Sequence, residues 1–325
     1  MSKPRPVLLL SLIKAAITLS LIGLICAKID FPGLMRHLDG ANTLYLLLGT
    51  LLLGANVPLV ALRWWLILRR LGVATIPLGH AVAGTYAAVF VGQATPGAIG
   101  TDAVRGWFCY GRGVKLRSIV MSLVTDRLLA LLGLVAVAGL VSFWQFRTID
   151  QNLQRQIGIL GIIVVMAAAV ALWFMPALTG RLARRGGRWQ ELHALPAIFR
   201  FTALSPAGAA GLALSCVVIT VTINAVMLFA HGFGIFLPAS VAYLIVPVAV
   251  LSSSLPISIG GWGVREASLS YGLALFGTAS ADAALLGLAL GIGLLLASLP
   301  GGIVLLLSGG RIRPALHRAD TRLVE

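Results

Sequence analysis

The chain has 325 residues, of which 59% are hydrophobic and 11% are charged, and its formal net charge is +15. Soluble domains carry about 25% charged residues, so this composition excludes a chain that keeps its whole surface in water. The apolar residues also form blocks of the length that crosses a hydrocarbon core as a helix, which is about 20 residues. We therefore expect an all-α integral membrane protein, with residues 1–325 forming a single transmembrane domain. The six expected full spans are 7–27, 43–62, 118–144, 157–178, 206–230 and 283–307.

The strong positive charge indicates lipid contact in this setting. In a soluble protein a net charge of +15 would suggest a nucleic-acid partner, but here the basic residues flank apolar spans and no soluble domain is available to carry a recognition motif. We therefore expect anionic lipid headgroups as partners, and no nucleic acid. The three cysteines and five histidines lack ligand spacing, so no metal and no cofactor is expected.

Basic residues also predict the topology, because arginine and lysine accumulate on the cytoplasmic side of the membrane. Basic clusters follow the expected spans 43–62, 157–178 and 283–307, and another follows the segment 77–112. This pattern places both termini in the cytoplasm of a multi-pass protein of the inner membrane. It also requires the segment 77–112 to enter and leave by the cytoplasmic face, and 241–276 to do so by the outer face. We read the first apolar run as an uncleaved helix rather than a signal peptide.

The segments 77–112 and 241–276 each consist of two short apolar arms around a break. The break residues are Pro96, Gly97 and Gly100 in the first segment and Pro256, Gly260 and Gly261 in the second. Proline and glycine both disfavour a helix interior, and irregular backbone at membrane depth persists only where it is buried in protein or lines a polar cavity. We therefore expect two re-entrant hairpins of broken helix. The alternative is a pair of short spans at each place, which leaves the topology unchanged.

The two segments match each other in sequence. The pattern Pro-x-x-Ile-Gly-x-x-x-Val-Arg occurs at residues 96–105 and again at residues 256–265. The apolar blocks around the two segments run in opposite directions in the expected topology, which predicts inverted repeat units at about 43–144 and 206–307. Inverted repeats with broken helices near the midplane are typical of transporters.

Charged residues within the apolar blocks gather close to the breaks. These residues are Asp102, Arg105, Asp126, Arg127, Arg265 and Glu266. A charge at the bilayer centre costs about 2.5–3.5 kcal/mol on insertion scales, so such residues are candidates for substrate binding. The guanidinium fork binds phosphate in a bidentate manner, so the two arginines of the matching pattern, one per hairpin, are expected to bind a phosphate-bearing headgroup.

The carboxylates of this set have several roles open to them. Asp102, Asp126 and Glu266 could pair with the arginines, relay protons or meet a cationic group. The structural alternative is a set of internal salt bridges that hold the hairpins to their neighbours. Arg63 is expected to anchor at the membrane interface, and Gly287-x-x-x-Gly291 is expected to serve helix packing alone.

Three stretches resemble the flippase-like transmembrane family, which includes the membrane region of lysylphosphatidylglycerol synthases. They are residues 96–105, Thr125-Asp126-Arg127 and residues 255–266, where Gly-Gly-Trp-Gly-x-Arg-Glu is the most specific run. The resemblance extends over about residues 10–308. Thr101 departs from the family pattern, in which a second glycine is common before the aspartate. The soluble aminoacyl-transferase domain of the synthases is not expected here, so the resemblance implies lipid translocation or lipid-glycan handling and not lysyl transfer.

Three functions follow from these observations. The first is a flippase or transporter that moves an anionic, phosphate-bearing lipid or lipid-linked headgroup. The second is a membrane enzyme that acts on a lipid-linked substrate, although the sequence lacks a nucleophile–base arrangement and nucleotide-binding loops, so we expect no enzyme and no catalytic residues. The third is a scaffold or accessory subunit for enzymes of a lipid or glycan pathway. Self-association into a homo-oligomer is compatible with all three.

Overall fold

The computed structural model describes residues 40–144, 204–255 and 257–321, and within these ranges the chain forms eight helices and no strand. This confirms the expected all-α class. The helices are α3 (Thr43–Arg70), α4 (Leu78–Gly92), α5 (Ile99–Tyr110), α6 (Leu116–Trp144), α9 (Pro206–Gly232), α10 (Ala239–Ser253), α11 (Val264–Ala274) and α12 (Ser280–Thr321). The expected spans 7–27 and 157–178, and the break residue Pro256, lie outside the described residues.

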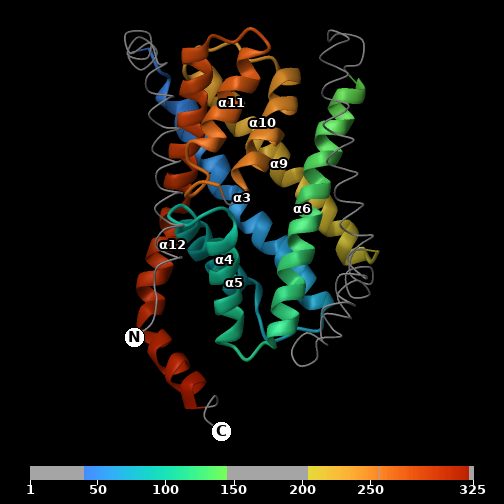
Figure 1. Ribbon diagram of the computed structural model, residues 1–325, viewed down its shortest axis with the longest axis vertical. Coiled ribbons are helices and arrows are strands. Elements are labelled where there is room, and N and C mark those ends of the chain that lie inside the picture. The colour runs from blue at the N-terminus through green and yellow to red at the C-terminus, as the bar shows by residue number, and fades with distance from the viewer. Residues whose placement is uncertain (1–39, 145–203, 256, 322–325) are drawn as a thin grey trace.

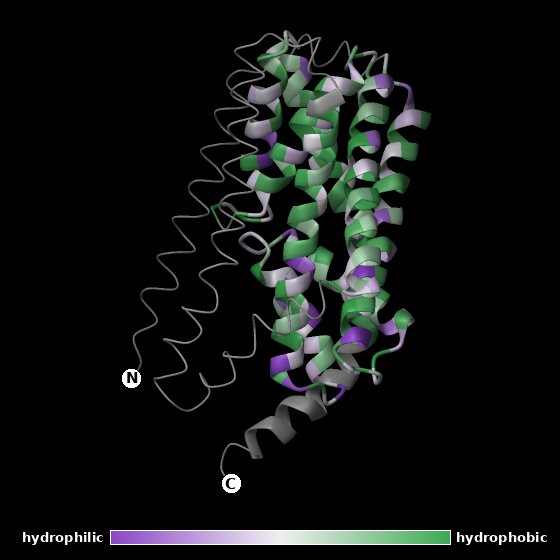
Figure 2. Cartoon of the chain, turned by 90° about the vertical axis from the view of Figure 1, so that its right-hand side faces the viewer, coloured by the Kyte–Doolittle hydropathy of each residue, from purple (hydrophilic) through white to green (hydrophobic). Residues whose placement is uncertain are grey.

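Four of these helices are long and apolar enough to cross a membrane, which confirms that the chain is an integral membrane protein. Their apolar segments are Thr43–Arg70, Leu116–Val141, Pro206–Gly232 and Ser280–Leu307. Hydrophobic residues cover most of the length of the helices (Figure 2). The structure also lengthens the expected span 43–62, because α3 continues for a further eight residues to Arg70.

Local sequence explains where the long helices begin and end. The side chain of Asn42 accepts a hydrogen bond from the Leu44 backbone N–H, and the side chain of Ser205 accepts one from Gly208 N at 3.2 Å. Such caps satisfy donors that lack an intrahelical partner. Proline follows the cap in α9, at the position where its missing N–H costs nothing. Arg69 and Arg70 lie in the last turn of α3, where a positive charge is favoured by the helix dipole.

The helices are arranged as two helical hairpins among four long helices. Helices α3, α6, α9 and α12 extend along the long axis of the molecule (Figure 1). Hairpin 1, which comprises α4, residues 93–98 and α5, occupies the lower half of the view, and hairpin 2, which comprises α10, residues 254–263 and α11, occupies the upper half (Figure 1). Helix α12 contacts α4 of hairpin 1 and α11 of hairpin 2, so it passes both.

The order and size of the elements repeat along the chain. Residues 43–144 and residues 206–307 each contain a long helix, two short helices and another long helix. The first short helices, α4 and α10, have 15 residues each, and the second, α5 and α11, have 12 and 11.

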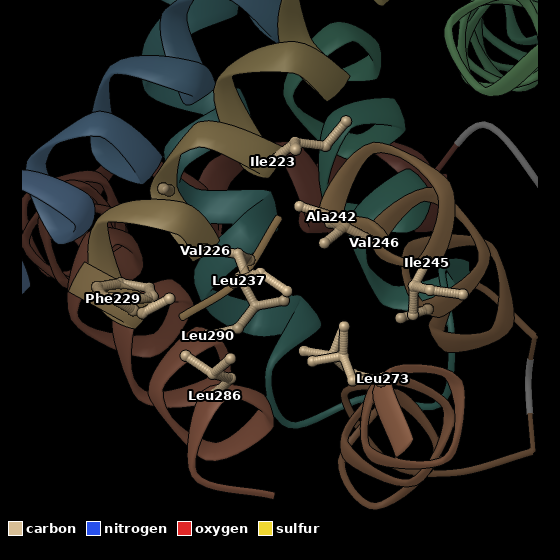
Figure 3. Close-up of a cluster of buried hydrophobic side chains, with 14 of the residues drawn as sticks. Ile223, Val226, Phe229, Leu237, Ala242, Ile245, Val246, Leu273, Leu286 and Leu290 are labelled. Carbon is tan, nitrogen blue, oxygen red and sulfur yellow. The ribbon is translucent and has the colours of Figure 1, made fainter. Parts of the chain in front are cut away.

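The apolar core is larger around hairpin 2 than around hairpin 1. Side chains from α9, α10, α11 and α12, among them Phe229, Ile245, Leu273 and Leu290, form one extensive cluster (Figure 3). A smaller cluster forms around Trp64 and Leu68 at the other end of the bundle, between α3 and hairpin 1. Three buried charged side chains also lie next to hairpin 1, namely Arg63, Arg105 and Asp126, and they form part of the candidate site.

Candidate functional site

The two breaks meet through backbone hydrogen bonds. We call residues 93–98 tip 1 and residues 254–263 tip 2. The Gly260 N–H donates to the Thr95 carbonyl at 2.8 Å, and the Gly97 N–H donates to the Ser258 carbonyl at 3.3 Å. These two bonds flank an isolated antiparallel bridge between Pro96 and Ile259. Tip 1 and tip 2 thus satisfy part of each other's irregular backbone.

The identity of the break residues explains this contact. Pro96 is tolerated in the bridge because both bonds use its neighbours, and no N–H is required at its own position. Gly97 and Gly260 have φ angles of 55° and 60°, a region that L side chains rarely adopt. A side chain on Gly260 would also collide with the Gln93 backbone carbonyl, so glycine is needed for the close approach of the tips.

The two hairpins resume helix at different points after the break. Helix α5 begins at Ile99, three residues after Pro96, whereas α11 begins only at Val264. The cause lies in tip 2, where Gly261 and Gly263 have φ angles of 75° and 81° and cannot continue a right-handed helix. Thr101, at the position that matches Gly261, adopts helix instead. Threonine in place of glycine at this position therefore coincides with an earlier start of α5.

Hairpin 1 is joined to the long helices by a buried charge network around Asp126 of α6. Arg63 of α3 donates to both carboxylate oxygens of Asp126, from Nε at 2.7 Å and from Nη2 at 3.1 Å. Arg105 of α5 donates from Nη1 to the same carboxylate at 3.1 Å. All three side chains are at least 95% buried. Arg63 also donates to the Ser215 hydroxyl of α9 at 3.0 Å. The network around Asp126 therefore connects four helices, α3, α5, α6 and α9.

The burial of Arg63 corrects the prediction that this residue anchors at the membrane interface. An interface anchor extends its charged end toward water, but Arg63 is only 4% exposed and points into the protein. The prediction was wrong because the span was expected to end just before Arg63, whereas α3 continues for two more turns. Seven residues of helix correspond to about 10 Å, so Arg63 lies well inside the end of α3.

A second ion pair lies beside the buried network and is more accessible. Arg127 of α6 donates to both oxygens of Asp102 of α5, from Nε at 3.1 Å and from Nη2 at 2.8 Å. The two side chains are 40% and 27% exposed. Helices α5 and α6 are thus joined by two ion pairs of opposite polarity. In one pair the acid is on α5 (Asp102 with Arg127), and in the other the acid is on α6 (Asp126 with Arg105).

The buried part of this network is not electrically balanced. Arg63 and Arg105 share the single carboxylate of Asp126, which leaves one positive charge without a counterion among these three buried side chains. Arg105 Nε is buried without a hydrogen-bond partner, and so is the neighbouring Thr125 hydroxyl. The guanidinium of Arg105 lies 5.4 Å from the centroid of the Trp64 ring, which provides a cation–π contact but not a counterion. An excess buried cation with a free donor favours an anion nearby.

Hairpin 2 carries a pair of a different kind. Arg265 donates to Glu266 Oε1 from Nε at 3.0 Å and from Nη2 at 2.5 Å, and both side chains are at least 97% buried. The Gly263 N–H donates to the other oxygen of Glu266 at 2.6 Å, at the first turn of α11. Arg265 also stacks on Trp262 at 5.1 Å. Arg265 therefore has a counterion of its own, Glu266, whereas Arg105 shares its counterion Asp126 with Arg63.

The glycine pair of α12 holds this part of hairpin 2 in place. A side chain at Gly291 would lie 2.7 Å from Arg265 Nη2 and 2.8 Å from the Trp262 ring, and one at Gly287 would lie 3.0 Å from the Glu266 backbone. The expected role in helix packing is correct, but the packing partner is the ion pair itself. The sequence showed the spacing of the two glycines but could not show what lay against them.

The structure thus places every described site candidate in an ion pair. Asp102 pairs with Arg127, Asp126 with Arg63 and Arg105, and Arg265 with Glu266. The two arginines of the repeated pattern have no carboxylate in common. Whether these residues bind substrate stays a prediction. Among the described residues, no three His, Cys, Asp or Glu side chains are grouped so that they could hold a metal ion.

Comparison with known proteins gives one family. The family model described as the lysylphosphatidylglycerol synthase TM region matches residues 11–301 of the chain. A search of curated proteins found no match to the chain.

Proposed function

Because the chain belongs to the family of the lysylphosphatidylglycerol synthase TM region, we propose that it transports lipid and moves an anionic, phosphate-bearing lipid or lipid-linked headgroup across the inner membrane. The proposal is of a transporter and not of an enzyme. It places the headgroup near hairpin 1, and it includes cytoplasmic termini and a pair of inverted repeats at about 43–144 and 206–307.

The observation on which the proposal depends is the excess positive charge beside hairpin 1. Two arginines at 4% and 3% exposure share one carboxylate, and Arg105 has a free Nε donor. Burial of an uncompensated charge is costly, and a chain that retains such a charge commonly uses it to bind a ligand of opposite sign. The adjacent pair of Arg127 and Asp102 is partly exposed, so a headgroup can reach the network from that side. A phosphate matches both the sign and the fork geometry of the arginines.

The arrangement of the hairpins supports movement rather than binding alone. The two units repeat the same four helices, and hairpins 1 and 2 meet tip to tip with the long helices alongside (Figure 1). Broken helices that approach one site from opposite sides allow a substrate to be reached from either face. In this proposal the hairpins are re-entrant, with hairpin 1 entering from the cytoplasmic face and hairpin 2 from the outer face.

The test uses purified protein in vesicles that contain a trace of phosphatidylglycerol with a fluorophore on one acyl chain. A reductant that cannot cross the membrane quenches the fluorophore in the outer leaflet, so the rate of further quenching reports lipid movement. We expect movement that depends on the protein, is faster for this lipid than for phosphatidylcholine labelled in the same way, and is lost in Arg105→Gln. Equal rates for the two lipids, or an unchanged rate in a folded Arg105→Gln, would remove the anionic site from the proposal.

The other two functions give different outcomes in the same preparation. A membrane enzyme would convert the lipid to a product that chromatography detects. A scaffold would neither move nor convert lipid. Arg127→Gln serves as a second variant if Arg105→Gln does not fold, because its side chain is 40% exposed and its loss leaves no buried partner.

A further inference from the structure

We propose that the contact between tip 1 and tip 2 is a latch that opens when an oxyanion takes over the Gly97 and Gly260 N–H groups. In the closed latch these two donors bind the Ser258 and Thr95 carbonyls of the opposite tip. The inference rests on the proposed function, because it concerns how the headgroup passes between the hairpins. It adds a binding site made of backbone donors to the arginine site beside hairpin 1.

The latch is a small contact and can open at low cost. It consists of the two hydrogen bonds that define a single bridge, and the net contribution of one hydrogen bond to stability is small. Each hairpin is held instead by other contacts: hairpin 1 by the Asp126 network and hairpin 2 by its packing on α12. The tips can therefore separate while each hairpin stays attached to the long helices.

Polar atoms at the latch are left without partners in the closed state. The Ser258 hydroxyl is fully buried and has no hydrogen-bond partner, and the Gln93 side-chain oxygen is also buried without one. Both residues belong to the tips, and their backbones take part in the close approach at Gly97 and Gly260. Unsatisfied buried polar groups of this kind call for a ligand or water.

The chemistry of the exposed groups defines the ligand. When the latch opens, the Gly97 and Gly260 N–H groups lose their acceptors, and an anionic oxygen is the strongest replacement for both. The released carbonyls of Thr95 and Ser258 accept donors, which a hydroxyl or ammonium group on the same headgroup supplies. A ligand that replaces the lost bonds stabilises the open state by its difference in affinity for the two states. The structure therefore assigns to the tips an oxyanion that also carries hydrogen-bond donors.

The first experiment closes the latch covalently. Pro96 and Ile259 are opposite each other in the non-hydrogen-bonded position of an antiparallel bridge, where Cα atoms lie about 4.5 Å apart, a distance that suits a disulfide. We introduce Pro96→Cys and Ile259→Cys into a protein freed of its three native cysteines. Lipid movement is expected to fall to the rate of protein-free vesicles on oxidation and to recover on reduction.

The matched control places a disulfide within hairpin 2 and away from the latch. The hydroxyls of Ser252 in α10 and Ser268 in α11 lie 2.8 Å apart, so Ser252→Cys with Ser268→Cys joins the two helices of one hairpin. Oxidation of this variant is expected to leave lipid movement unchanged. If the oxidised Pro96→Cys/Ile259→Cys protein moves lipid as fast as its reduced form, the latch is refuted and the proposed function stands.

A second experiment observes the latch without any transport assay. Spin labels at Ala94→Cys and Ile257→Cys, both at exposed positions of the tips, report the distance between tip 1 and tip 2. We expect one short distance in phosphatidylcholine vesicles, whose headgroup has a phosphate but no hydrogen-bond donor. An added longer distance is expected in phosphatidylglycerol vesicles, whose headgroup has both. Addition of inorganic phosphate to phosphatidylcholine vesicles separates the two sources of oxyanion, since a longer distance there indicates free phosphate. One short distance under all three conditions refutes the latch even if no protein variant moves lipid.

A third variant opens the latch without ligand. Gly260→Ala places a side chain against the Gln93 carbonyl at a φ of 60°. The longer spin-label distance should then appear in phosphatidylcholine vesicles. Gly234→Ala is the control, because Gly234 has a φ of 67° but nothing within 4 Å of the added methyl group. Equal distance distributions in the two variants would contradict the assignment of Gly260 to the latch.

Discussion

Asp126→Asn tests whether the buried network beside hairpin 1 holds the bundle together. The carboxylate accepts three hydrogen bonds from Arg63 and Arg105 at 2.7–3.1 Å, and it is the only acid that either arginine contacts among the described residues. Asparagine keeps the shape but removes the charge, which leaves two buried cations with no counterion. Removal of one partner from a buried pair destabilises proteins by about 3–5 kcal/mol, and we expect a loss in this range.

Asp102→Asn is the matched control for this variant. It is the same substitution at the same interface between α5 and α6, and Asp102 also binds an arginine through two hydrogen bonds. Its pair is 27% and 40% exposed, so solvent screens the interaction and the expected loss is at most about 1 kcal/mol. Equilibrium unfolding in mixed detergent micelles, followed by tryptophan fluorescence, measures both free energies.

The double variant Asp126→Asn/Arg63→Gln separates charge balance from lost hydrogen bonds. Removal of Arg63 together with the carboxylate leaves one buried cation instead of two. We therefore expect the double variant to be more stable than the sum of the two single changes predicts. Equal losses for Asp126→Asn and Asp102→Asn, or strict additivity in the double variant, would refute the reasoning.

Three further changes test other parts of the structure. Gly291→Ala brings a methyl group to 2.7–2.9 Å from three groups of hairpin 2, so the free energy of unfolding should fall by about 1–3 kcal/mol. Gly139→Ala has open space around the added methyl group and should be close to neutral. Thermal unfolding of the two variants compares them. Ser215→Ala removes one hydrogen bond from Arg63 and should cost about 1–3 kcal/mol in the same micelle assay. Thr101→Gly should destabilise the first turn of α5 by about 0.3 kcal/mol, and faster amide exchange of that turn would show it.

Sequence patterns predicted the architecture well where they depend on neighbouring residues. The two broken segments were expected at 77–112 and 241–276, and the structure has helix pairs at 78–110 and 239–274. Proline and glycine act on the backbone at their own positions, so their effect can be read locally. Re-entry from one face remains a prediction, because it concerns the position of the membrane.

The site was harder to predict because its partners come from distant parts of the chain. Arg105 and Arg265 occupy equivalent positions in the repeated pattern, which led to the expectation of equivalent roles. Their counterions differ: Asp126 reaches Arg105 from the following long helix, whereas Glu266 is the next residue after Arg265. Arg63 was missed for the same reason, since nothing within α3 indicates that an acid 63 residues further along the chain lies against it.

The difference between the hairpins has a functional consequence. A balanced pair packed against Gly291 fixes hairpin 2 on α12, and the large apolar cluster around it adds to that rigidity. Hairpin 1 instead meets its neighbours through a network with an excess cation and a partly exposed ion pair, and a bound anion would change its electrostatic energy directly. A ligand can shift a conformational equilibrium only if it binds one conformation more tightly than the other. The charge imbalance gives hairpin 1, but not hairpin 2, a means to such a difference in affinity for an anion. In a mechanism built on the tip latch, hairpin 1 is therefore the element expected to respond to the headgroup, while hairpin 2 acts as the fixed surface against which the latch closes.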